Sequence, residues 1–155
     1  MSTPDRPGAD GRRSLGGTRR KARKRAVDIL YEADIRGVDA VGLLAERTGA
    51  PDLQPMRDYT ITLVEGVTAN RERIDGILTE HSEGWSVPRM PAVDRAVLRL
   101  GLYELLWAPD ATDAAVVIDE AVALVKSLST DDSPRFVNAV LDRIAGIAPQ
   151  LRAIL

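Results

Sequence analysis

A dense basic run near the start of the chain has the clearest chemical meaning. Six of the seven residues from Arg19 to Arg25 are Lys or Arg. Clustered guanidinium and ammonium groups bind phosphates and displace counterions from a polyanion, so the run predicts a nucleic-acid surface. The alternative is a basic segment that only aids solubility or binds the acidic remainder of the same chain.

The formal net charge of −2 hides a strong division along the 155-residue chain. Residues 1–25 contain nine Lys/Arg and two Asp, a net charge of +7. Residues 26–155 contain twelve Lys/Arg and twenty-one Asp/Glu, a net charge of −9. A cationic N-terminal segment is therefore joined to an acidic body.

Groups for catalysis and metal binding are sparse. The chain has no Cys and one His, His81, which excludes thiolate chemistry and Cys-ligated metals and argues against a His-rich site. None of the three lysines follows a glycine, so a phosphate-binding P-loop is absent. For the Asp131–Asp132 pair, which precedes Pro134, we favour helix capping over metal binding. We predict no catalytic residues, no metal site and no cofactor.

The elements that must position the basic run are predicted to be helical. Residues 1–17 are rich in Gly, Pro, Ser, Asp and Arg, which predicts a disordered basic tail. A helix is predicted to begin at Thr18 and end at Gly37. Its apolar stripe is predicted to face the core, which leaves the basic residues on the remaining faces. The stripe consists of Ala22, Ala26, Ile29, Leu30 and Ala33.

The remaining sequence predicts an all-α fold of six to seven helices in two packed helical subdomains. The later helices are predicted over residues 39–48, 54–80 with a break at Gly66 or Asn70, 92–108, 113–129, and from Ser133 as N-cap with Pro134 at the first helical position.

Residues 18–155 are predicted to form a single domain, with subdomains over about residues 18–84 and 85–150. The connector at residues 84–91 contains two prolines and a glycine. The chain has neither a membrane-spanning apolar segment nor a secretory signal, and we expect a cytoplasmic protein.

Three segments of the chain resemble, in order and spacing, the NusB family of transcription antitermination factors. They are Arg19–Ala26 with Leu30–Asp34; Val93–Arg99 with Tyr103–Leu106; and Ile118–Val122 with Lys126, Ser129–Ser133 and Phe136–Asn138. Together they span the chain from Thr18 to about Ile147.

The resemblance implies a NusB-like helical adaptor that binds boxA-type single-stranded RNA together with NusE, a ribosomal small-subunit protein, in the RNA polymerase elongation complex with other Nus factors. The residues that it implies for RNA binding are Arg19, Arg20, Lys21, Arg23, Lys24, Arg135 and Phe136. Those that it implies for the protein partner are Tyr31, Asp94 and Asp132. Relatives occur as monomers or dimers, so a homodimer is a further expectation.

Two positions depart from the family pattern, and several interpretations stay open. Asp119 stands where asparagine is common, and Ala139 where glycine is common. The ring of Phe136 either stacks on a base or belongs to the core, and Tyr31 either projects to a partner or lies between helices. The alternative functions are a protein-interaction scaffold without RNA, an RNA-substrate module of the methyltransferase type, and a DNA-binding helix-turn-helix.

Overall fold

The computed structural model describes residues 7–48 and 58–155, with side chains in the first range described from Thr18 onward. Within these ranges every regular element is a helix, which confirms the all-α prediction. The elements are α1 (Pro7–Arg36), α2 (Ala40–Thr48), α3 (Asp58–Ala69), α4 (Arg71–His81), the 3₁₀-helix η1 (Val87–Arg89), α5 (Ala92–Leu106), α6 (Ala114–Leu128), α7 (Ser133–Gly146) and α8 (Ala148–Ala153).

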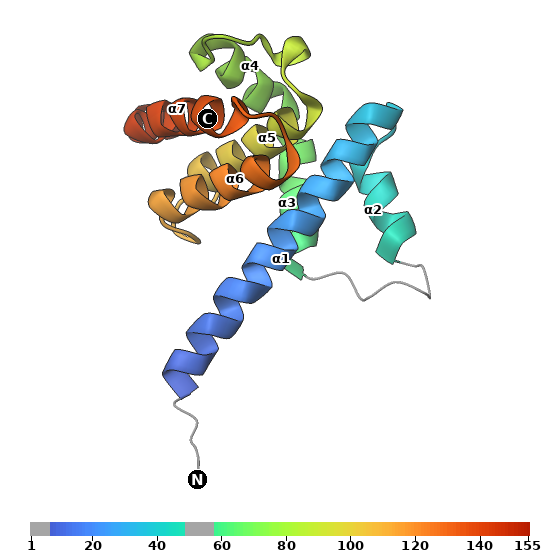
Figure 1. The fold of residues 1–155 in the computed structure, drawn as a ribbon, viewed down its shortest axis with the longest axis vertical. Coiled ribbons are helices and arrows are strands. Elements are labelled where there is room, and N and C mark those ends of the chain that lie inside the picture. The colour runs from blue at the N-terminus through green and yellow to red at the C-terminus, as the bar shows by residue number, and fades with distance from the viewer. Residues whose placement is uncertain (1–6, 49–57) are drawn as a thin grey trace.

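Helix α1 carries the basic run along the side of the bundle and extends past it at its N-terminal end (Figure 1). The predicted apolar stripe from Ala22 to Ala33 is buried against the bundle, and α1 packs mainly on α3 and α5. The helix ends at Gly37, whose φ of +66° lies in the left-handed region that favours glycine. The Val38 amide donates to the Ala33 carbonyl at 3.0 Å, a contact of the Schellman type.

The start of α1 differs from the prediction. The backbone is helical from Pro7, whereas the sequence predicted a disordered tail over residues 1–17 and a helix start at Thr18. Once a helix has nucleated, each added residue gains a hydrogen bond at small cost, so a glycine-containing segment can continue it. Thr18 therefore lies inside α1 and not at its cap.

Helix α5 is the central element, with α1, α3, α4, α6, α7 and α8 packed around it. Its residues from Ala96 to Leu102 are all buried. Gly66 of α3 lies directly against the ring of Tyr103, where a Cβ atom would overlap the ring. The glycine therefore lets α3 approach α5 closely.

Several ends of the other helices differ from those predicted from the sequence. Asn70, and not Gly66, separates α3 from α4, while the predicted start at Gln54 lies outside the described residues. Asp132 is the N-cap of α7, so Ser133 is the first helical residue and Pro134 the second. Leu128, the last residue of α6, is 39% exposed. Helix α8 was not predicted.

In the described part of the chain, the buried side chains of the eight α-helices form one hydrophobic cluster. The division into subdomains at about residue 84 therefore stays a prediction. Among the described residues, no helix is both long and apolar enough to span a bilayer.

Candidate nucleic-acid interface

The orientation of α1 divides its basic residues between the bundle and the solvent. Arg20 and Lys21 are exposed, whereas Arg23 is only 4% exposed. Arg19, Lys24 and Arg25 have intermediate exposure. The basic run is thus one continuous cluster in sequence, but only part of it forms a cationic surface.

Arg23 is held inside the bundle by Glu104 of α5. Arg23 Nε lies 2.9 Å from Glu104 Oε1, and Arg23 Nη2 lies 2.9 Å from Oε2. The two side chains are 5% and 1% exposed. Burial lowers the pKa of Arg23, but the hydrogen bonds and opposite charge of Glu104 outweigh it, so the pKa is raised. The prediction that Arg23 faces outward to RNA was wrong, because this pair turns it into the core.

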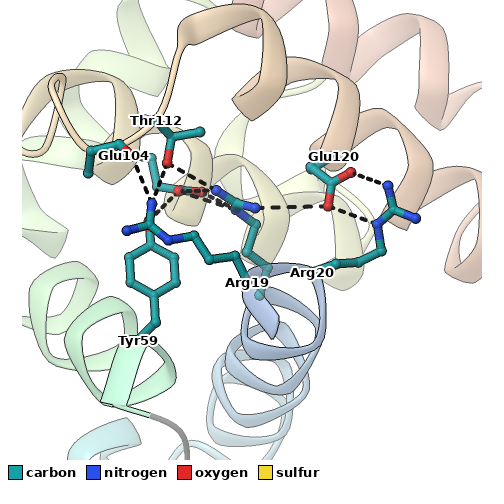
Figure 2. A network of polar contacts seen from close by, with 8 residues as sticks. Arg19, Arg20, Tyr59, Glu104, Thr112 and Glu120 are labelled. Carbon is teal, nitrogen blue, oxygen red and sulfur yellow. Dashed lines mark hydrogen bonds and ion pairs between the residues drawn. The ribbon is translucent and has the colours of Figure 1, made fainter. Parts of the chain in front are cut away.

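Tyr59 of α3 completes the buried network (Figure 2). Its hydroxyl donates to Glu104 Oε2. Burial, reinforced by the negative charge of Glu104, raises the pKa of Tyr59 to about 12. The Arg19 guanidinium lies over the Tyr59 ring, 4.4 Å from its centroid, and Arg19 Nη1 donates to Ala111 O at 2.8 Å and Thr112 Oγ1 at 2.9 Å. Arg19 is thereby fixed at the edge of the surface.

Arg20 pairs with Glu120 of α6 through two parallel hydrogen bonds (Figure 2). The distances are 3.2 Å from Nε to Oε1 and 3.0 Å from Nη2 to Oε2. Hydrogen bonding to Glu120 raises the pKa of Arg20. This fork-to-fork geometry is also the one in which guanidinium binds phosphate. A phosphate reaching Arg20 therefore has to compete with Glu120.

Lys21 and Lys24 add two further charges to this surface. Lys24 Nζ lies 2.8 Å from Asp28 Oδ2 one turn along α1, and both side chains are about half exposed. An exposed pair of this kind is weak and readily exchanged. Lys21 and Lys24, with Arg20, are therefore the described residues best placed to meet a polyanion.

Arg135 and Phe136 lie on α7, whose main contacts are with α6 and α5. Arg135 is exposed and Phe136 is half-buried. The Phe136 ring meets Trp85 edge to face, with centroids 4.8 Å apart and an interplanar angle of 75°. The ring therefore packs on the connector and keeps some exposure, and its stacking on a base stays a prediction.

The three residues predicted to meet a protein partner differ in their surroundings. Tyr31 is 38% exposed, and Asp132 is exposed at the start of α7. Asp94 is fully buried, and its Oδ1 accepts a hydrogen bond from Ser129 Oγ at 2.6 Å. The prediction that Asp94 faces a partner is therefore wrong for this structure, because α5 lies at the centre of the bundle.

Sequence reasoning missed the acidic side chains that organise this site, although two signals were present. Glu104 is the one charged residue in the stretch from Leu100 to Trp107, which indicates a buried partner. Arg23 precedes Val27 and Leu30 at helical spacing, and both of these are buried. Glu120, whose contact with Arg20 spans 100 residues, left no comparable signal.

Comparisons with known proteins identify the family of this chain. The family model described as "NusB family" matches residues 20–146. The transcription antitermination protein NusB of Saccharopolyspora erythraea is 72% identical over 139 residues, which cover 90% of this chain and 94% of the relative.

Two solved structures are similar as well. NusB of T. maritima has a TM-score of 0.73 and 34% identity, and the match covers 88% of this chain and 97% of that one. A structure of NusB and NusE in complex with double-stranded RNA contains a chain with a TM-score of 0.71 and 31% identity. The match covers 83% of this chain and 96% of that one. This chain therefore belongs to the NusB family.

Proposed function

We propose that this chain is a non-enzymatic transcription antitermination adaptor, which joins boxA-like single-stranded RNA to NusE and to the elongating RNA polymerase with other Nus factors. The observation that carries the proposal is the exposed cationic surface of α1, with Arg20 and Lys21 outward while Ala22 and Ala26 anchor the same helix in the core. The similar structure that holds NusB, NusE and RNA supports both partners.

In this proposal, Arg19, Arg20, Lys21 and Lys24 contact RNA phosphates. Cations presented by a folded helix meet the strand without the entropic cost of ordering a flexible arm. Arg135 and Phe136 supply a second contact region, in which the exposed part of the Phe136 ring stacks on a base. Arg23 acts indirectly, because its pair with Glu104 holds this part of α1 against the bundle.

The protein partner, in this proposal, binds the C-terminal end of α1. Tyr31 and Ile35 lie one helical turn apart and are 38% and 60% exposed, and Val38 is 43% exposed. An apolar group of this kind beside Asp28 and Glu32 suits a basic protein. Asp132 belongs to the same proposal as an exposed acidic contact.

A cytoplasmic location and a homodimer of the RNA-free chain are further parts of the proposal. Action on RNA during its synthesis supports the location. Light scattering with and without RNA tests for the dimer, since a dimer that covers α1 should dissociate when RNA binds.

The test of the main proposal is capture of NusE by the full chain with and without boxA RNA. We expect RNA to increase the NusE recovered. Lys21→Ala with Lys24→Ala should abolish the increase, whereas Arg73→Ala with Arg89→Ala, which removes the same charge from exposed positions elsewhere, should preserve it. NusE capture that ignores RNA would instead support a protein scaffold without an RNA role.

A further inference from the structure

A groove between α1 and α6 lies beside the cationic surface and has a volume of about 290 Å³. Arg20 and Lys24 line one side of it, one turn apart on α1. The α6 side is lined by Glu120, Ala123, Leu124, Ser127 and Leu128. These five residues recur at spacings of three, one, three and one, so they form a single face of α6.

The groove combines a cationic surface with an apolar one. Its α1 wall is cationic, with the Arg20 side chain 74% and the Lys24 side chain 44% exposed. Its floor is apolar, with Leu124 half-buried and Leu128 39% exposed. A ligand that fits both surfaces carries an anionic group beside an apolar one, as a nucleotide does with its phosphate and the faces of its base.

We propose that this groove is a nucleotide subsite, which takes one unstacked base of a bound RNA strand against Ala123, Leu124 and Leu128. The adjacent phosphate pairs with Arg20 and Lys24. The inference rests on the proposed function, because it requires a single strand that follows α1. Such a strand has unpaired bases free to turn aside and pack on a protein surface, which a duplex does not offer.

The polar groups of the groove fit this assignment. Glu120 is 13% exposed and pairs with Arg20, so it keeps the guanidinium at the rim until a phosphate replaces it. Ser127 also lines the groove and is exposed, and its hydroxyl can donate to or accept from a base edge. The charge on the α1 wall selects for an anionic strand, and the apolar floor adds binding that does not depend on charge.

The proposal is tested with a substitution that partly fills the groove and leaves its charge unchanged. Ala123→Leu adds bulk at an exposed position of α6, and Ala115→Leu is the matched control, because Ala115 is exposed on the same helix and outside the groove. Alanine and leucine are both strong helix formers, so we expect both variants to fold. Binding of the full-length variants to end-labelled boxA RNA is measured at several salt concentrations.

We expect Ala123→Leu to weaken binding about fivefold, which is ~1 kcal/mol at ~1.4 kcal/mol per tenfold. The slope of log K against log salt should stay unchanged, because the lost contact is uncharged. Ala115→Leu should bind like the unmodified chain. Unaltered binding by Ala123→Leu, or a loss accompanied by a shallower slope, would overturn the base subsite alone. A failure of the unmodified chain to bind RNA would overturn the proposed function as well.

Discussion

Arg23 and Glu104 form a buried ion pair between α1 and α5, with Arg23 Nη2 2.9 Å from Glu104 Oε2. The basic run therefore serves two purposes within a few residues. Arg23 joins α1 to the central helix α5, while Arg20 and Lys21 remain at the surface. Substitutions within the run should consequently separate into those that affect folding and those that affect binding.

Arg23→Ala should lower the free energy of unfolding by about 3–5 kcal/mol, because it leaves the buried Glu104 carboxylate unpaired. Urea unfolding followed by circular dichroism measures the change. Arg20→Ala, at a largely exposed position, is the control and should unfold almost like the unmodified chain. Equal stability of the two variants would show that the Arg23 pair contributes little.

Glu120→Gln should strengthen RNA binding, because Arg20 no longer has an internal carboxylate to exchange for a phosphate. If Arg20 then makes one additional phosphate contact, the slope of log K against log salt becomes steeper by about 0.7. Glu72→Gln, which makes the same chemical change at an exposed site on α4, should leave the slope as it is. Weaker binding by Glu120→Gln would mean that Glu120 orients Arg20 for RNA and does not compete with it.

The salt dependence of the unmodified chain should correspond to fewer contacts than the basic run suggests. With Arg23 internal, about three to four α1 cations remain for phosphates, which predicts a slope of about −2 to −3. Titrations of boxA RNA across a range of salt concentrations give the value. A flat dependence would exclude phosphate binding by this helix.

Phe136→Leu should lower RNA affinity by about 1–3 kcal/mol, because a leucine side chain cannot stack as an aromatic ring does. It also removes the edge-to-face contact with Trp85, worth about 0.5–1.5 kcal/mol of folding stability. Measuring RNA binding and thermal unfolding on the same samples separates the two effects. Reduced stability with full affinity would identify Phe136 as a core residue only.

Tyr59 should make the stability of the fold depend on pH in the alkaline range. Its pKa is raised from 10.0 to about 12 by burial and Glu104, so the folded state holds the proton more tightly than the unfolded state. The resulting stabilisation is complete below pH 10 and is lost as the pH rises toward 12. Unfolding measured across this window should show a steeper decline for the unmodified chain than for Tyr59→Phe. Identical profiles would contradict the assignment.

Local sequence patterns were sufficient for most of the fold. The spacing of apolar residues located the buried stripe of α1, including Ala22 and Ala26, and the left-handed stop at Gly37. The helix start at Pro7 and the N-cap at Asp132 were placed differently, because helix ends depend on a few weak local interactions that competing residues can shift.

The sequence alone determined that the chain is helical, lacks cysteine and has a cationic segment before an acidic body. These properties depend only on residue type and on short-range spacing. Which cations face outward was decided by tertiary structure. Glu104 and Glu120 lie 81 and 100 residues from their arginine partners, and only the packing of α5 and α6 against α1 brings those carboxylates within hydrogen-bond reach. That packing buries Arg23, keeps Arg20 at the rim and creates the groove between α1 and α6.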